Sequence, residues 1–308
     1  MKRVAVCGSG SDVHVRYVAR AIERQGARVL FVDTALVPER KPLSWSLGKT
    51  TYDGCDLTEI RAVYVKSLSW SLPAVDPFEL PHRNFARWQD KLVAERERHS
   101  FLGAVLRELD QPHVTFVNPL DTFSLHYMKP HQLGVLMRAG LPVPDSLATC
   151  DPEAARAFLD SHEAVICKPL AGGAHVRKVE AADANGRLDL VRNAPVLLQE
   201  QVVGEEFRAY VLDSEPVKAF RVPTGDAADA RENVADCVPA ELPEEAWELC
   251  VRAASALGLT FTAADLRRRS DGRFVILELN PTPAISFYDD PREGKVISRL
   301  ASFLVAHA

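Results

Sequence analysis

Three oxygen-bearing side chains near the C-terminal end of the sequence, those of Asp265, Glu278 and Asn280, have a spacing that can bring them to one surface. In a β-hairpin that turns at residues 271–272, Glu278 lies directly across from Asp265. Asn280 lies two residues beyond Glu278, and side chains alternate between the two faces of a strand. One face of this hairpin is therefore expected to carry two carboxylates and an amide oxygen.

This arrangement of oxygen atoms calls for a cation. Opposed carboxylates on a sheet repel each other, and their removal from water is unfavourable by several kcal/mol unless a positive charge compensates. Oxygen-only ligands suit Mg²⁺, which keeps several waters and usually shares its coordination with substrate phosphates. The pattern therefore predicts a magnesium-dependent nucleotide site, with a surface hairpin of two solvated acids as the alternative.

The hairpin itself is predicted from the segments that flank Asp271-Gly272. Both residues of this dipeptide tolerate a positive φ, which is typical of two-residue hairpin turns. The flanking residues 261–270 and 273–280 suit extended structure. A slip of one residue in the register would turn the acidic side chains to the other face, so the site depends on this pairing.

Composition is that of an ordinary soluble globular protein. The 308 residues are 47% hydrophobic and 26% charged, with a net charge of −5, which argues against broad nucleic-acid binding. The length predicts about two domains. No apolar run is long enough to span a bilayer, and the N-terminus lacks the hydrophobic segment of a signal peptide. We expect a cytoplasmic protein without membrane or nucleic-acid partners, for which a homo-oligomer is compatible with the composition.

The N-terminal segment predicts a βαβ unit. Strand, helix and strand are expected over residues 2–7, 13–25 and 28–33. Gly8 and Gly10 follow the first strand, and Asp33 ends the second, which invites a dinucleotide site for NAD(P) or FAD. The third glycine of that motif is missing, because Val13 stands in its place, so this oxidoreductase interpretation is kept only as an alternative.

Further helices and strands complete a mixed α and β pattern. Residues 36–57, which contain two prolines and two glycines, are expected to be irregular. Amphipathic spacing predicts helices over residues 85–109, 129–139, 244–257 and 294–306. Short apolar runs predict strands over residues 60–65, 114–117, 165–169, 196–200, 207–212 and 217–222.

A lysine lies inside one of these apolar strands. Lys168 ends the run VICK and precedes the glycine-bearing turn AGGAHV. An ammonium at a strand end, followed by exposed backbone N–H groups, can hold a phosphate. A lysine that extends to solvent before a tight turn is the simpler alternative for this motif alone.

The chain resembles the ATP-grasp superfamily, and within it the branch of the ribosomal-protein-S6 (RimK-like) glutamate ligases and the graspetide or microviridin macrocyclases. The resemblance covers residues 117–308 closely and the preceding residues loosely. Six motifs in this order carry it: Asn118-Pro119, KPHQLGVLMRAGLPVP, VICKPLAGG, QEQVVGEEFRAYVLD, ARENV, and AADL with LELNPTP.

This resemblance implies roles for individual residues. Nucleotide contacts fall on Lys129, Lys168, the lid glycines Gly172 and Gly173, the hinge residues Gln199, Glu200 and Val202, and the ribose carboxylate Glu206. Contacts to phosphate or acyl phosphate fall on Arg208, Arg221, Arg231 and Asn233. The metal ligands correspond to Asp265, Glu278 and Asn280. The short lid sequence departs from the longer loop of many relatives, which affects the contacts of His175, and Glu206 stands where the ligases often have Asp.

The implied fold is an ATP-grasp fold of α+β and α/β class with an N-terminal βαβ domain. Its parts are an N-terminal domain (1–118), a lid-bearing central subdomain (119–198) and a C-terminal subdomain (199–308). The implied activity is ATP-dependent carboxylate-amine ligation through an acyl phosphate, with Mg²⁺ or Mn²⁺ and with a peptide or amino-acid derivative as acceptor. Alternatives are a macrocyclase that forms esters or amides within a ribosomal precursor peptide, and a non-catalytic nucleotide-binding protein.

Overall fold

The computed structural model describes every residue except 68–86, 172–175, 181–185, 224–236, 291 and 293. The chain forms two compact units, of which the first comprises Met1–Leu120 with Pro291–Ala308 and the second comprises Asp121–Asp290. The boundary expected at residue 118 lies close to this division, whereas the C-terminal segment groups with the first unit. The further division expected at residue 198 stays a prediction.

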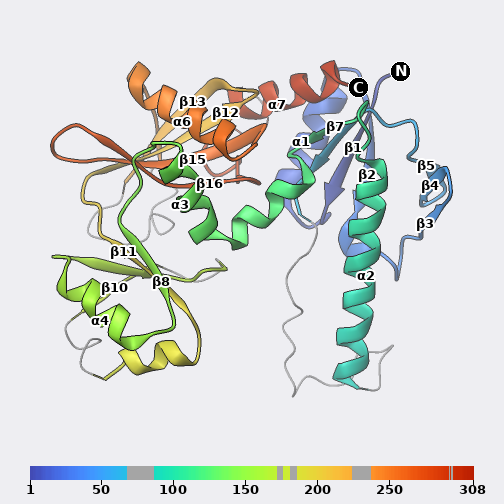
Figure 1. The fold of residues 1–308 in the computed structure, drawn as a ribbon. Helices are drawn as coiled ribbons and strands as arrows, with labels where there is room; N and C mark the ends of the chain where they lie inside the picture. Colours follow the sequence, from blue (N-terminus) through green and yellow to red (C-terminus); the bar gives the residue numbers. More distant parts are fainter. Residues whose placement is uncertain (68–86, 172–175, 181–185, 224–236, 291, 293) are drawn as a thin grey trace. The chain divides into compact units, whose positions relative to one another are not determined.

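A parallel four-stranded sheet forms the centre of the first unit, in the order β2-β1-β6-β7 (Figure 1). Residues 4–7 of its inner strand β1 are apolar and buried, as expected for a strand covered on both faces. The C-terminal helix α7 packs against α1, and Lys2 Nζ donates to the Val305 carbonyl at 2.6 Å. The strands are β1 (Arg3–Gly8), β2 (Arg28–Asp33), β6 (Ala62–Val65) and β7 (Thr115–Val117), and the helices are α1 (Val13–Arg24), α2 (Trp88–Leu109) and α7 (Lys295–Ala306).

A small antiparallel sheet forms where the sequence predicted irregular structure, so that expectation was wrong. Its strands are β3 (Leu43–Ser46), β4 (Lys49–Tyr52) and β5 (Cys55–Asp56). Each has at most four residues, and polar residues occupy most of them. Strands this short carry too little alternation to be recognised from the sequence.

The glycines and the acid of the dinucleotide alternative have packing roles in the first unit. A Cβ atom on Gly8 would lie 2.9 Å from Val15 Cγ2, and one on Gly10 would lie 2.3 Å from Asp33 Oδ2. Asp33 Oδ1 also accepts a hydrogen bond from the Ala35 amide at 3.1 Å. The glycine spacing is therefore explained by close packing, without a dinucleotide.

The second unit contains a four-stranded sheet in the order β10-β9-β11-β8. Its apolar side packs against α4 and the short helix η3 through Ala155, Val165, Leu188 and Leu198. Helix α4 is capped by Asp151, whose side chain accepts from the Glu153 amide at 3.0 Å. The elements are β8 (Ser146–Thr149), α4 (Pro152–Asp160), β9 (Val165–Lys168), β10 (Arg177–Lys178), η3 (Leu188–Arg192) and β11 (Val196–Glu200).

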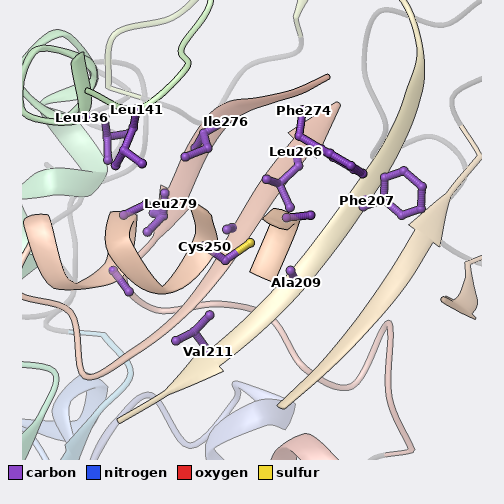
Figure 2. Packing of buried hydrophobic residues seen from close by; sticks show 14 of the residues in the cluster. Leu136, Leu141, Phe207, Ala209, Val211, Cys250, Leu266, Phe274, Ile276 and Leu279 are labelled. Atoms are coloured by element: carbon purple, nitrogen blue, oxygen red, sulfur yellow. The ribbon is translucent and has the colours of Figure 1, made fainter. Parts of the chain in front are cut away.

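A five-stranded antiparallel sheet in the order β14-β13-β12-β15-β16 completes the second unit. Figure 2 shows that one face of this sheet packs its apolar side chains against the helix that carries Cys250. Alternation along the strands leaves the opposite face for polar side chains. The strands are β12 (Glu205–Leu212), β13 (Glu215–Val222), β14 (Val238–Ala240), β15 (Phe261–Arg268) and β16 (Phe274–Asn280), and the adjoining helices are η2 (Leu120–Tyr127), α3 (Lys129–Arg138) and α6 (Glu244–Ala256).

The predicted hairpin is formed by β15 and β16, but its turn differs from the prediction. The loop has three residues, 270–272, and Gly272 adopts φ +85° at its last position. The Gly272 amide donates to the Arg269 carbonyl at 2.9 Å, and the Arg269 amide donates to the Arg273 carbonyl at 2.9 Å. A turn followed by a left-handed glycine is a common three-residue hairpin connection. The two-residue turn was therefore wrong.

A β-bulge in β16 restores the predicted pairing. Leu266 pairs with Ile276, whereas Asp265 pairs with Glu278, so Leu277 is an extra residue in the strand. Asp265 therefore lies across from Glu278 as predicted. The extra residue also changes the alternation of β16, which sends Ile276 into the apolar core and turns Glu278 to the opposite face.

Close backbone contact between strands generates a test of this fold. Gly204 precedes β12 with φ +149°, and a Cβ atom there would lie 1.9 Å from the Arg268 carbonyl oxygen. We expect Gly204→Ala to lower the free energy of unfolding by about 3 kcal/mol in urea titrations. Gly272→Ala, at a positive φ in open space, should lower it by only about 1 kcal/mol. Equal losses for the two variants would contradict the close approach at Gly204.

Candidate functional site

The sheet face opposite α6 carries two cross-strand ion pairs between β12 and β15. Arg208 pairs with Asp265 in the register, and its Nη1 lies 2.8 and 3.1 Å from the two carboxylate oxygens. Glu206 pairs with Arg267, whose Nη2 and Nε lie 2.7 and 2.9 Å from Glu206 Oε2. Because Glu206, Arg208 and Arg267 are buried, each charge requires its partner.

The second acid of the hairpin, Glu278, forms an ion pair with Lys129, the first residue of α3. Helix α3 is fixed against β16 by the buried amide of Gln132. Its Nε2 donates to the Leu279 carbonyl at 2.9 Å, and its Oε1 accepts from the Leu279 amide at 2.8 Å. Helix and strand therefore hold Lys129 and Glu278 together.

Lys168 ends β9 with a side chain that has no ionic or hydrogen-bonding partner among the described residues. The residue is only 9% exposed. Burial lowers the pKa of Lys168, while the negative charge of Glu278 opposes this shift. In the antiparallel register, Lys168 shares a face with Leu197 and Gln199 of β11. A buried ammonium without a partner is unfavourable, so Lys168 is a candidate for binding an anion.

The two paired acids respond differently to their surroundings. Burial raises the pKa of Asp265 to about 7, although Arg208 opposes the change. Burial acts in the same direction on Glu278, but Lys129 and Lys168 outweigh it and hold the pKa of Glu278 below its usual value. The charged form is therefore favoured at Glu278 and disfavoured at Asp265.

Asp265, Glu278 and Asn280 offer the oxygen atoms expected of a magnesium site. They lie on one face of the hairpin, as the pairing of Asp265 with Glu278 and of Ala263 with Asn280 shows. Asn280 Oδ1 also accepts from the Thr282 amide at 3.2 Å. No group of three or more His, Cys, Asp or Glu side chains suited to a metal forms among the described residues. Two carboxylates with one amide oxygen fit Mg²⁺, which completes its shell with water and phosphate.

The segment after β16 contributes contacts to the same face. The Tyr288 ring centroid lies 4.7 Å from the Arg208 guanidinium carbon. Asp289 is buried, and its Oδ1 lies 2.5 Å from Lys218 Nζ. This segment therefore both stacks on Arg208 and is anchored to β13.

Two features of the candidate hinge follow from hydrogen bonds around β11. Ser146 donates its hydroxyl to the Pro144 carbonyl at 2.9 Å, so its oxygen accepts the Gln199 Nε2 hydrogen at 2.9 Å. This contact directs Gln199 Oε1 elsewhere, and that buried atom has no hydrogen-bond partner among the residues that the structure describes. The Val202 carbonyl accepts from Arg267 Nη1 at 2.7 Å, which joins the hinge to β15.

Glu200, the remaining predicted hinge residue, has a structural partner. Its Oε1 lies 2.6 Å from Arg269 Nη2 and accepts from the Asp145 amide at 3.1 Å. These contacts tie the end of β11 to the residues before β8 and after β15. The Glu200 side chain thus fixes the hinge.

Some predicted site residues are not brought to this face. Arg221 pairs with Phe207 in the register, and Phe207 lies in the apolar core, so Arg221 points away from Arg208. Its side chain is 55% exposed and lies 3.6 Å from Glu205. Alternation along β13 is the physical reason. Five other predicted site residues lie outside the described residues: Gly172, Gly173, His175, Arg231 and Asn233.

Several residues on this face were not predicted from the sequence. Gln132 and Leu279 are 147 residues apart, and no local pattern links them. Arg267 could have been found, because alternation in β15 places it on the face of Asp265. The residues missed in the prediction are Gln132, Lys218, Arg267, Tyr288 and Asp289.

Residues 123–302 match the ATP-grasp domain, R2K clade family 3. A probable alpha-L-glutamate ligase of Xanthomonas euvesicatoria pv. vesicatoria is 28% identical over 200 residues, which cover 60% of this chain and 66% of that protein. The tetrahydromethanopterin:alpha-L-glutamate ligase of Methanosarcina acetivorans is 28% identical over 190 residues, which cover 54% of this chain and 58% of that protein. The chain thus spans about two thirds or less of the length of these relatives.

Similarity to solved structures extends over the whole chain. The ATP-grasp ligase PsnB, in complex with a phosphomimetic variant of its minimal precursor, Mg and ADP, is 33% identical with a TM-score of 0.88. That match covers 99% of this chain and 98% of PsnB. The macrocyclase MdnC from Microcystis aeruginosa MRC, bound with the precursor peptide MdnA, has a TM-score of 0.81 at 20% identity, with 99% of each chain covered, and shows the shared fold alone. The predicted fold class is confirmed.

The charge arrangement around Glu278 predicts the effect of one substitution. Glu278→Gln keeps the shape of the side chain but removes its charge, and metal ligation supplies several kcal/mol of transition-state stabilisation. We expect magnesium-dependent ADP release to fall by about a hundredfold or more while the circular dichroism spectrum is unchanged. Glu205→Gln, at an exposed ion pair with Arg268, is the control and should retain activity. Near-normal ADP release by Glu278→Gln would remove Glu278 from the candidate metal ligands.

Proposed function

The chain belongs to the ATP-grasp domain, R2K clade family 3, and on that basis we propose that it joins a carboxylate to an amine of a peptide or amino-acid derivative. The predicted ATP-dependent ligase agrees with its relatives, which include glutamate ligases and a peptide ligase. ATP-grasp ligases use ATP and magnesium, as in the PsnB complex with Mg and ADP. The substrates, the product bond and the roles of individual residues are the proposal.

The buried ammonium of Lys168 is the observation that carries this proposal. It has no partner among the described residues, and it lies in the electrostatic environment of Glu278, Lys129, Glu206 and Asp265. An ATP phosphate supplies the missing negative charge, since charge-assisted hydrogen bonds are strong where water is excluded. Lys168 and Lys129 are therefore proposed to hold the phosphates.

The other end of the nucleotide is proposed to lie along β11 and β12. Gln199 Oε1, which is buried and has no partner in the described part of the chain, suits the exocyclic amine of adenine. Glu206 Oε1 suits a ribose hydroxyl, because the hydrogen bonds from Arg267 reach only Oε2. We retain Glu200 and Val202 as hinge residues, and Gly172 and Gly173 as lid residues, on the family resemblance.

Asp265, Glu278 and Asn280 are proposed to hold Mg²⁺, with Mn²⁺ as a substitute that accepts the same oxygen ligands. When bound, the metal neutralises charge on the phosphates during transfer. Arg208 is proposed to contact the transferred phosphoryl group, with Tyr288 stacked on its guanidinium. Arg231 and Asn233 stay in the proposal through the sequence motif, whereas the exposed position of Arg221 does not support its role.

The proposed chemistry has two steps. A substrate carboxylate oxygen attacks the γ-phosphorus of ATP, which forms an acyl phosphate and releases ADP. An amine nitrogen then attacks the acyl carbon, the new amide bond forms, and phosphate and a proton leave. Lys129, Lys168 and Arg208 stabilise negative charge in both steps, and positioning accounts for the remainder of the rate enhancement.

A peptide is favoured as the substrate by the extent of the similarities. The similarity to PsnB covers 99% of this chain, including its N-terminal unit, whereas the match to the Xanthomonas ligase covers 60%. PsnB is seen with its precursor peptide. The same observation supports a second candidate function, in which the carboxylate and the nucleophile belong to one peptide and the product is a macrocyclic amide or ester.

Location and assembly complete the proposal. Among the described residues, no helix combines the length and apolar character needed to cross a membrane. We propose a cytoplasmic location and no nucleic-acid partner, in line with the net charge of −5. A homo-oligomer is compatible with this function.

One experiment separates the candidate functions. Purified protein with MgATP is given either free glutamate with an acceptor peptide or a peptide that carries acidic, lysine and threonine side chains. ADP release is followed, hydroxylamine traps the acyl phosphate as a hydroxamate, and mass spectrometry identifies the product. Gain of an amino-acid residue indicates intermolecular ligation, and loss of one water within a peptide indicates a macrocycle. ADP release without hydroxamate would overturn the acyl-phosphate mechanism.

Substitution of Lys168 tests its proposed contact with phosphate. Lys168→Met removes the buried ammonium but fills the apolar space, so thermal stability without nucleotide should be maintained or increased. We expect the dissociation constant for MgATP to rise by about tenfold or more in calorimetry. Lys295→Met, at the exposed start of α7, should leave binding unchanged. Unaltered affinity in Lys168→Met would show that Lys168 does not bind phosphate.

Gln199 provides a test of base recognition. Gln199→Leu removes the acceptor proposed for the adenine amine, so affinity for ATP should fall. The ratio of ATP to GTP affinity should decrease by about tenfold, because guanine presents a carbonyl at this position. Competition binding with the two nucleotides measures this ratio. An unchanged ratio would place the adenine amine elsewhere.

A further inference from the structure

Arg267 joins two parts of the candidate nucleotide site that are otherwise separate. Its Nε and Nη2 donate to Glu206 Oε2 at 2.9 and 2.7 Å, and its Nη1 donates to the Val202 carbonyl at 2.7 Å. The residue is only 9% exposed. One guanidinium therefore connects the hinge backbone with the carboxylate proposed for the ribose.

Stability alone does not account for this arrangement. A buried ion pair often contributes no more stability than apolar residues of similar volume, because both charges must leave water. Glu206 is 8% exposed, and its Oε1 has no hydrogen-bond partner among the described residues. An acceptor oxygen with unused capacity on a mostly buried residue points to a ligand that donates hydrogen bonds.

We propose that Arg267 is a positioning residue that sets the preference of this site for ribose over 2′-deoxyribose. The proposal rests on the proposed function, in which Glu206 meets the ribose. Both hydrogen bonds from Arg267 to the carboxylate end on Oε2, which orients Glu206 so that Oε1 faces the ligand. The third hydrogen bond, to Val202, fixes the guanidinium relative to the hinge that holds the base.

The geometry requires arginine rather than any cation. A guanidinium presents its donors in a rigid planar fork, which can satisfy a carboxylate and a separate carbonyl at once. A lysine ammonium retains the charge but cannot maintain three directed hydrogen bonds to these two acceptors in the same plane. Arg267→Lys therefore keeps charge compensation for Glu206 and releases its orientation.

The neighbouring residue provides a matched control. Arg268 pairs with Glu205 on the same two strands, one position along the register and on the opposite face. The Arg268 side chain is 45% exposed. Arg268→Lys is thus the same substitution in the same type of cross-strand pair, outside the candidate site.

The test compares the binding of MgATP and Mg-2′-deoxy-ATP by calorimetry in the full chain, Arg267→Lys and Arg268→Lys. We expect the unsubstituted chain to favour ATP, and we expect Arg267→Lys to reduce that preference by roughly tenfold, mostly through weaker ATP binding. Arg268→Lys should retain it. Equal weakening of both nucleotides in Arg267→Lys would show a purely structural role and overturn the proposal.

Two further outcomes separate this inference from the proposed function. Failure of the unsubstituted chain to bind either nucleotide overturns the proposed function and the positioning role together. Normal binding with an unchanged preference in Arg267→Lys overturns the positioning role alone.

If Arg267→Lys does not fold, Glu206→Gln replaces it as the test variant. The amide oxygen of the new glutamine can still accept from Arg267, while its NH₂ group replaces the acceptor oxygen that faces the ribose. Glu206→Gln should then lose the preference for ATP, and retention of that preference would overturn the proposal.

Discussion

Charge compensation on the face of the five-stranded sheet opposite α6 is the constraint on which the rest of the second unit depends. Three carboxylates on this face have a cationic partner each: Arg208 for Asp265, Arg267 for Glu206 and Lys129 for Glu278. The opposite face packs against α6 and contains the apolar core. The strands can hold these charges out of water only because neighbouring strands and α3 provide side chains of opposite charge.

The same compensation explains how this face can serve chemistry. Lys168 is the cation without a partner among the described residues, and it lies among groups that already neutralise one another. A negatively charged ligand can enter without leaving any protein charge uncompensated. The site is thus arranged for charge before a ligand arrives, which is the condition under which electrostatic stabilisation is most effective.

The hairpin shows how far the sequence allows prediction and where prediction stops. Alternation and pairing placed Asp265, Glu278 and Asn280 on one face, and the structure agrees. The turn was predicted one residue too short, and the extra strand residue Leu277 offset that error, because bulges leave no clear pattern in the sequence.

Other parts of the site depend on contacts between distant segments. The resemblance indicated lysines and acids with recognisable neighbours in the chain. It could not indicate that alternation in β13 directs Arg221 away from the site, or that Gln132 fixes Leu279 from 147 residues away. Short polar strands such as β3 to β5 were missed for a related reason, since their pairing is determined by tertiary contacts and not by their own periodicity.

The extra residue in β16 decides which face of the strand each following side chain occupies, so the site depends on this added residue. Ile276 belongs to the core and Glu278 to the charged face, although they are two positions apart and a regular strand would direct both to the same side. A regular hairpin with the same sequence would therefore either bury the acid in the apolar core or turn the isoleucine to the charged face. Designers who transplant this arrangement of side chains must copy the backbone irregularity together with the side chains.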